Sequence, residues 1–245
     1  MKEAIALLKE RGATCRLVGG CVRDALLGQK PNDFDVEVYG LELDTIANTL
    51  QTIGRTDRVG KSFAVVKLWR HGSEYDFSVP RTESKSGTGH RGFEIHPDIS
   101  LDEKTALRRR DFTINALLYD PDKEVIIDYY GGQADLKNGI LRHVSDAFSE
   151  DPLRALRAVQ FAGRFGLKLH PDTAELCKQM KSEYSTLALE RIWGEWRKWA
   201  EKSRIPSMGM VALKESGWIA FFPEINALLR LPQDPEWHPE GDVFT

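Results

Sequence analysis

The sequence predicts an α/β domain followed by an all-α region. Up to about residue 145, short apolar segments of strand type alternate with amphipathic segments of helix type. Two of the strand-like segments, 63–69 and 75–79, flank a short turn and predict a hairpin. After that point the pattern is mainly helical. We therefore expect two domains, 1–145 and 146–245.

The amino-acid composition is that of an ordinary globular protein. The 245 residues are 41% hydrophobic and 29% charged, which is ordinary for a globular protein with a real core. No apolar run approaches the roughly 20 residues of a membrane span. Cys15, Cys21 and Cys177 form no CxxC pair, which predicts a reducing cytoplasm and neither a zinc site nor a disulfide framework. Because the net charge is −3, a polyanionic partner would have to meet a local basic patch.

A glycine pair begins the segment around which the first domain is organised. Gly19 and Gly20 follow a short apolar segment and precede an expected helix at 22–27. A glycine lets backbone N–H groups come close to a ligand, and a helix start favours anions. Arg23, one turn into the helix, could supply a bidentate fork for phosphate oxygens.

Carboxylates follow directly after this helix. Asp33 and Asp35 are two apart on an expected strand and so face the same way, about 6–7 Å apart. Such a pair can bridge two divalent cations, whose usual spacing is about 3.5–4 Å. Along 75–79 the apolar side chains would take one face and Asp76 the other, so Asp76 is a candidate third carboxylate near this pair, or else a solvent-facing strand aspartate. The alternative is a surface turn with solvated aspartates.

Two further stretches of the first domain carry many charges or glycines. The segment 80–98 is rich in glycine and basic residues, which is typical of a functional loop but also of a simple connection. The segment 104–116 is expected to be one helix. Arg108, Arg109 and Arg110 lie in it, and three consecutive residues cannot share one helical face, so at least one should point inward at an anion.

The second region opens with a predicted helix start. Asp151 can cap that helix and Pro152 fits its first turn. Arg154 and Arg157 are three apart and share a face. Further along, tryptophans recur at every third position (Trp193, Trp196 and Trp199), which favours interhelix packing over base stacking.

Several long motifs, in order, resemble the class II tRNA nucleotidyltransferase and bacterial poly(A) polymerase family. They are LVGGCVRDALLG with DFDVEV, RRDFTINALLYD, SEDPLRALRAVQFAGRFG and ERIWGE. The resemblance implies an α/β head with a mixed, nucleotidyltransferase-type sheet, residues 1–145, and a helical neck and body, 146–245. It also implies addition of C and A from CTP and ATP to tRNA 3′ ends, with Mg2+ as the cofactor and pyrophosphate as the leaving group.

The resemblance also implies roles for individual residues. Asp33 and Asp35 would be the metal ligands and catalytic carboxylates, and Asp76 is the candidate third catalytic carboxylate from the hairpin. The implied nucleotide-binding residues are Gly19, Gly20, Arg23, Arg110, Asp111, Asn115, Glu150, Asp151, Arg154 and Arg157. Glu150, Asp151 and Arg154 would read the base. Gln160 departs from the arginine that many relatives carry, so that contact is not expected here.

The sequence is also compatible with other functions. The single basic residue in Gly60–Phe63 favours CCA addition over poly(A) addition, and the segment 85–101 favours the ability to add A. A-only addition and a non-catalytic RNA-binding module are the alternatives. Residues 237–245 resemble the lead-in to an HD-type phosphohydrolase domain, so we expect a chain that ends before that domain.

Overall fold

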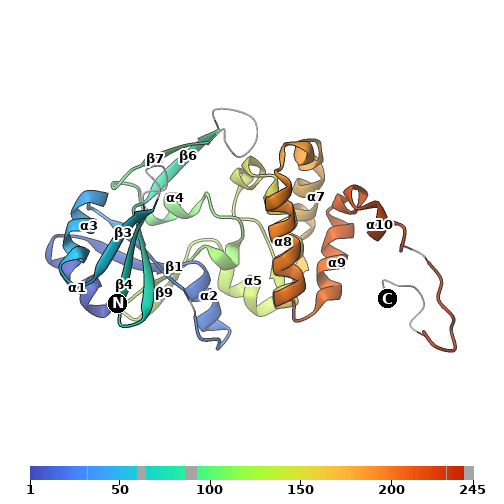
Figure 1. Cartoon of the computed structure of the whole chain (residues 1–245), viewed down its shortest axis with the longest axis horizontal. Helices are drawn as coiled ribbons and strands as arrows, with labels where there is room; N and C mark the ends of the chain where they lie inside the picture. Colours follow the sequence, from blue (N-terminus) through green and yellow to red (C-terminus); the bar gives the residue numbers. More distant parts are fainter. Residues whose placement is uncertain (32, 60–64, 86–92, 230, 240–245) are drawn as a thin grey trace. The chain divides into compact units, whose positions relative to one another are not determined.

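The computed structural model describes all residues except 32, 60–64, 86–92, 230 and 240–245 (Figure 1). The described chain divides into two compact units, one up to residue 133 and one from residue 134. The predicted boundary at 145 lies later than this division. The difference arises because β10 (Ile140–Leu141) pairs in parallel with β11 (Lys168–Leu169), which attaches that segment to the second unit.

The first unit contains a mixed sheet. Seven strands lie in the order β3-β4-β5-β2-β1-β8-β9. Their bounds are β1 (Thr14–Val18), β2 (Phe34–Tyr39), β3 (Arg55–Val59), β4 (Val65–Arg70), β5 (Ser73–Ser78), β8 (Leu117–Asp120) and β9 (Val125–Asp128). Strands β2 and β5 run parallel and the other neighbouring pairs are antiparallel. The predicted α/β head with a mixed sheet is confirmed.

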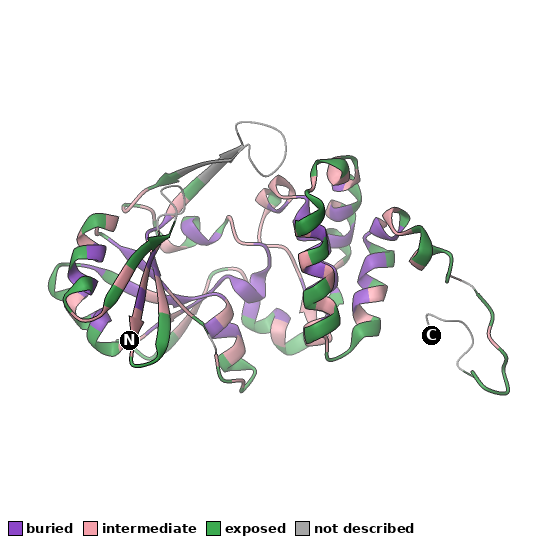
Figure 2. Ribbon diagram, in the orientation of Figure 1, coloured by how far each residue is buried: buried purple, intermediate pink, exposed green. Residues whose placement is uncertain are grey.

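Three helices bury their apolar stripes with this sheet in one core. They are α1 (Lys2–Glu10), α2 (Gly20–Leu26) and α3 (Leu43–Gln51), and α2 lies near the helix expected at 22–27. Leu8 and Leu50 are fully buried, whereas the outer sides of α1 and α3 are exposed (Figure 2). Amphipathic helices fold this way because burying the apolar stripe stabilises them more than helix propensity does.

Two sequence predictions for the first unit were wrong in detail. The segment 104–116 is α4 (Glu103–Leu107) followed by a separate turn of 3₁₀-helix, Thr113–Asn115. The Asp111 carboxylate accepts hydrogen bonds from the Phe112 N–H and from Asn115 Nδ2, and such local bonds compete with a continuing helix. The segment 80–98 contains two antiparallel strands, β6 (Arg81–Lys85) and β7 (Phe93–Pro97), while 86–92 lies outside the described residues.

Helices make up most of the second unit, as predicted. Their bounds are α6 (Leu153–Phe165), α7 (Pro171–Gln179), α8 (Leu189–Lys202), α9 (Pro206–Glu215) and α10 (Pro223–Asn226), with α5 (Gly132–Asn138) at the division between the units. Helix α6 packs against both α8 and α9. It ends at Gly166, whose φ of 67° is the left-handed conformation expected of a C-terminal glycine. Within the described part of the chain, no helix is long and apolar enough to cross a membrane.

Candidate active site

Strand register brings two of the predicted carboxylates together. In the parallel pair β2–β5, Asp35 lies opposite Asp76, and neighbouring strands are about 4.8 Å apart. Asp33 is exposed and lies one residue before β2. Phe77 in β5 and Val79 directly after it are buried, which agrees with the alternation predicted along 75–79. The first unit therefore places Asp35 and Asp76 side by side on two central strands, with Asp33 one residue before β2.

The groups around Asp35 shift its pKa in opposite directions. Burial raises the pKa of Asp35, the Arg110 guanidinium lowers it, and the carboxylates of Asp76 and Asp33 raise it further. Lys67 Nζ lies 3.0 and 3.3 Å from the two oxygens of Asp76. Sequence reasoning did not single out Lys67, although the hairpin register, which pairs it with Asp76, contains that signal. Two cationic side chains thus partly neutralise the cluster.

The donor set suits a hard divalent cation, because all three side chains offer carboxylate oxygens. No group of three or more His, Cys, Asp or Glu side chains is arranged to hold a metal ion within the residues that the structure describes. Mg2+ is usually held by one or two carboxylates together with substrate phosphates rather than by a cage of protein ligands. Asp33, Asp35 and Asp76 fit that mode of binding.

Arg110 lies against the glycine turn. Gly19 has φ 76° and ψ −125°, and a Cβ added there would lie only 2.7 Å from Arg110 Nη1. Gly20 has no positive φ, and a Cβ there would meet nothing closer than Arg23 Nη2 at 3.6 Å. The Nε of Arg110 is buried, and no described residue accepts a hydrogen bond from it. A buried guanidinium N–H without an acceptor is suited to an anionic ligand.

The other residues predicted around the triphosphate form a buried network in the first unit. Arg23 Nε and Nη2 donate to Asp24 Oδ1 at 2.8 and 2.6 Å, and Arg23 Nη1 donates to Asn115 Oδ1. Asn115 Nδ2 donates to Asp111 Oδ1 at 2.9 Å. Helix α2 is thereby tied to the 3₁₀ turn. Direct contact of Arg23, Asp111 and Asn115 with a nucleotide remains a prediction.

The Nε atoms of Arg109 and Arg110 are both buried, so the prediction that at least one of the three consecutive arginines points inward is confirmed. Arg109 Nη2 lies 3.6 Å from Oε1 of Glu37, which is fully buried in β2. The Tyr39 hydroxyl donates to the other oxygen of Glu37 at 2.9 Å. Arg108 is exposed. The pair of Arg109 and Glu37 anchors the segment from which Arg110 reaches the glycine turn.

The second unit contains the residues predicted to read the base. Asp151 Oδ1 accepts from the Leu153 N–H at 3.1 Å, so the predicted cap is present, although Pro152 lies at the cap position rather than inside the helix. Arg154 is buried and its Nη1 donates to the Ala147 carbonyl at 2.7 Å. Glu150 is half-buried.

Two further polar residues of α6 lie on the same helix as Arg154. The Arg157 guanidinium lies 5.3 Å from the centre of the Phe161 ring. Gln160, the departure from the family pattern, is buried, and no described residue accepts from its Nε2. The helix therefore carries one arginine half-exposed and one amide fully enclosed.

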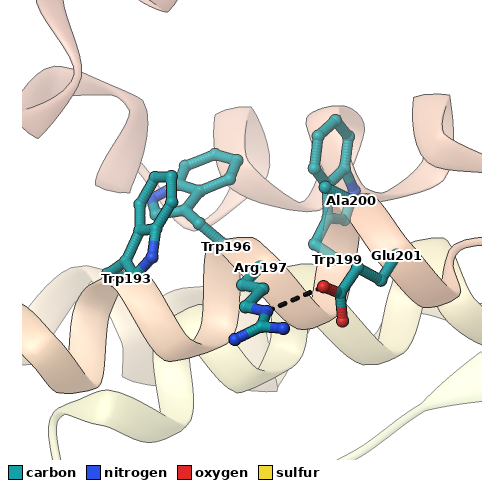
Figure 3. A pocket seen from close by; sticks show the side chains of 6 residues that line it. All are labelled: Trp193, Trp196, Arg197, Trp199, Ala200 and Glu201. Atoms are coloured by element: carbon teal, nitrogen blue, oxygen red, sulfur yellow. Dashed lines mark hydrogen bonds and ion pairs between the residues drawn. The ribbon is translucent and has the colours of Figure 1, made fainter.

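The tryptophan stripe packs between helices, as predicted, at two of its three positions. Trp196 lies edge-on to Trp199 and to Phe222, with ring centres 5.5 and 4.9 Å away. Trp199 fills the space left by two glycines, Gly163 on α6 and Gly209 on α9. Trp193 is 66% exposed and lines an open surface pocket of about 600 Å3 on α8 (Figure 3).

Residues 15–142 match the model of the poly A polymerase head domain family. The chain is 44% identical over 233 residues to a multifunctional CCA protein of Aliivibrio salmonicida, covering 93% of this chain and 55% of that protein. It is 42% identical over 230 residues to a multifunctional CCA protein of Neisseria gonorrhoeae, covering 92% and 54%. The chain thus spans about half the length of the curated relatives it matches.

Solved structures resemble both the fold and the sequence. The Thermotoga maritima CCA-adding enzyme complexed with tRNA superposes with a TM-score of 0.72 at 28% identity, over 89% of this chain and 50% of that one. The Bacillus stearothermophilus CCA-adding enzyme in complex with CTP superposes with a TM-score of 0.74 at 28% identity, over 88% and 51%.

Proposed function

Because the chain belongs to the poly(A) polymerase head domain family, we propose that it is an RNA nucleotidyltransferase that adds C and A to tRNA 3′ ends. The relatives named as multifunctional CCA proteins and the CCA-adding enzymes with tRNA or CTP support this substrate choice. The observation that carries the proposal is the pairing of Asp35 with Asp76 across β2 and β5, with Asp33 beside them.

In the proposed reaction, the RNA 3′-hydroxyl attacks the α-phosphate of the incoming nucleotide and pyrophosphate leaves. Asp33 and Asp35 would hold Mg2+, with Asp76 beside them, and the ion would supply charge stabilisation for the attacking and leaving oxygens. Arg110 supports the triphosphate role, because its buried Nε has no acceptor among the described residues. Gly19, Gly20 and Arg23 complete the proposed triphosphate-binding set, with Asp111 and Asn115 supporting Arg23.

We assign base selection to the helix start of α6. Cytosine and adenine both present an amino donor beside a ring-nitrogen acceptor, so one carboxylate and one guanidinium could serve both bases. Asp151 would accept from the amino group and Arg154 would donate to the ring nitrogen. Glu150 and Arg157 are the further proposed contacts of the nucleotide. The three buried free cysteines are consistent with a cytoplasmic location.

Two other functions predict different products. A poly(A) polymerase or an A-only enzyme of the same family would add A without C. The element 60–63, which bears on this choice, lies outside the described residues. A non-catalytic RNA-binding module would add neither nucleotide, and the three carboxylates argue against it.

The test uses the 245-residue chain with Mg2+ and three tRNA transcripts, ending before CC, after C and after CC, each with one labelled nucleotide triphosphate. The proposal predicts C addition to the first two transcripts and A addition to the third only. A-addition to all three would favour the poly(A) reading. No addition to any of them would contradict the proposed activity of this chain.

A further inference from the structure

An ion pair holds the carboxylate to which base selection is assigned. Arg191, in the first turn of α8, donates from Nη2 to Asp151 Oδ2 at 2.9 Å and from Nη1 to Asp151 Oδ1 at 3.4 Å. The two side chains are only 24% and 21% exposed, and the residues are 40 apart in sequence. The Arg191 guanidinium of α8 thus donates to both carboxylate oxygens of Asp151, which precedes α6.

The position of Arg191 is locally unfavourable, which indicates that the pair matters. A cation in the first turn of a helix opposes the helix dipole, which favours acidic residues there. Helix α8 has no side-chain cap, since Ala188 is at the cap position, and only Glu190 in the same turn offsets the charge. A residue that breaks a local rule is a candidate for a role set by tertiary contacts. Here the tertiary contact is Asp151.

Counting acceptor sites shows what the pair does to Asp151. A carboxylate has about four lone-pair directions, two on each oxygen. Oδ1 receives the Leu153 N–H at 3.1 Å and Arg191 Nη1, so both of its directions are used. Oδ2 receives Arg191 Nη2, which leaves one direction. The carboxylate is therefore fixed in orientation with a single acceptor direction remaining.

We propose that Arg191 is a positioning residue that fixes Asp151, so that its one remaining acceptor direction selects nucleotides whose base carries an amino group. This rests on the proposed function. Uracil and guanine present a carbonyl oxygen where cytosine and adenine present the amino donor. A fixed acceptor facing a carbonyl leaves both oxygens without a donor, which disfavours those bases. Without Arg191 the carboxylate could rotate and meet either kind of base through water.

The test compares CTP with UTP in the 245-residue chain, in three variants of α8, in Asp151→Asn and in the Asp151→Asn, Arg191→Met double variant. Arg191→Met removes the fork, and Arg191→Lys keeps the charge but not the bidentate geometry. Arg197→Met is the matched control, because Arg197 lies on the same helix and pairs with Glu201 at 2.7 Å without touching Asp151. The readout is the ratio of kcat/KM for CTP over UTP, which is independent of the fraction of folded enzyme.

We expect the ratio to fall at least tenfold in Arg191→Met, to fall less in Arg191→Lys, and to stay within twofold in Arg197→Met. Asp151→Asn combined with Arg191→Met should lower the ratio no further than the larger single effect. An unchanged ratio in Arg191→Met, with normal C addition by the wild type, would overturn the positioning role and leave the proposed function standing.

Equilibrium binding of the two nucleotides, measured with Mg2+ and without RNA, separates the remaining cases. A wild-type chain that adds no nucleotide but binds CTP over UTP, with the preference lost in Arg191→Met, would contradict the proposed function and support the positioning role. A wild-type chain that neither adds nor discriminates would overturn both.

Discussion

Replacing Gly19 by alanine tests the link between backbone geometry and the triphosphate site. Gly19 has φ 76° and ψ −125°, a conformation that residues with a Cβ rarely adopt. Strain of this kind costs about 1–3 kcal/mol. Taking about 2 kcal/mol for Gly19→Ala, the melting temperature should fall by roughly 4–8 °C in a chain of this size.

The same substitution should displace Arg110. The new Cβ would lie 2.7 Å from Arg110 Nη1, too close for contact, and the end of a flexible side chain moves more readily than backbone. We therefore expect Gly19→Ala to raise the KM for CTP and ATP about as much as Arg110→Ala does. In the double variant the effect on KM should not add, because both changes remove the same guanidinium from the same place.

Thermal unfolding and single-nucleotide addition measure the two effects separately. Gly20→Ala is the control for stability, since Gly20 has no positive φ and its nearest neighbour would lie 3.6 Å from the added Cβ. Its melting temperature should stay close to that of the wild type. A Gly19→Ala variant with wild-type melting temperature and wild-type KM would contradict both the backbone strain at Gly19 and the displacement of Arg110.

Three further outcomes are expected. Gly209→Ala should lower the melting temperature, because its Cβ would lie 2.2 Å from Trp199 Nε1 and overpacking costs about 1–3 kcal/mol. Gly194→Ala is the control and should not lower it, because a Cβ there meets nothing within 4 Å. Equal melting temperatures of the two variants would contradict the expected overpacking. Asp76→Asn should reduce nucleotide addition at least about tenfold if Asp76 supports the metal site, and a mere halving would make it a bystander. Burial lowers the pKa of His143, so below about pH 6.5 the unfolded chain binds more protons than the folded chain, and stability should decrease as the pH falls. His143→Gln should flatten that part of the pH profile of the melting temperature. An unchanged profile would contradict this role of His143.

The carboxylate site could be predicted from sequence because strand periodicity is a local property. Alternation along 75–79 put Asp76 on the face opposite the buried Phe77, and the structure agrees. The edge strand β3 was missed for the same reason, because its sequence RTDRV has no apolar alternation and its strand pairing is with β4. Such a strand depends on backbone hydrogen bonds to the neighbouring strand, and the local sequence pattern does not reveal that pairing.

Tertiary contacts account for the rest of the site. The helix expected over 104–116 stops because the Asp111 carboxylate accepts hydrogen bonds from the Phe112 N–H and from Asn115 Nδ2. The arginines before Asp111 therefore do not lie on one continuous helix. The partner of Asp151 is 40 residues away on another helix, and the sequence marked Arg191 only as part of the ERIWGE motif, without its partner. Ion pairs across such separations depend on packing that no local pattern encodes.

Asp33 and Asp35 are the residues proposed to support nucleotide transfer, and single-turnover addition of labelled C to a tRNA transcript lacking CCA measures their contribution. Removing either carboxylate should slow addition at least about 10³-fold, comparable with the loss of a main stabiliser of transition-state charge. Asp57→Asn, on the exposed edge strand β3, should keep the wild-type rate with the same melting temperature. Asp33→Ala or Asp35→Ala adding C at a near-normal rate would contradict the account.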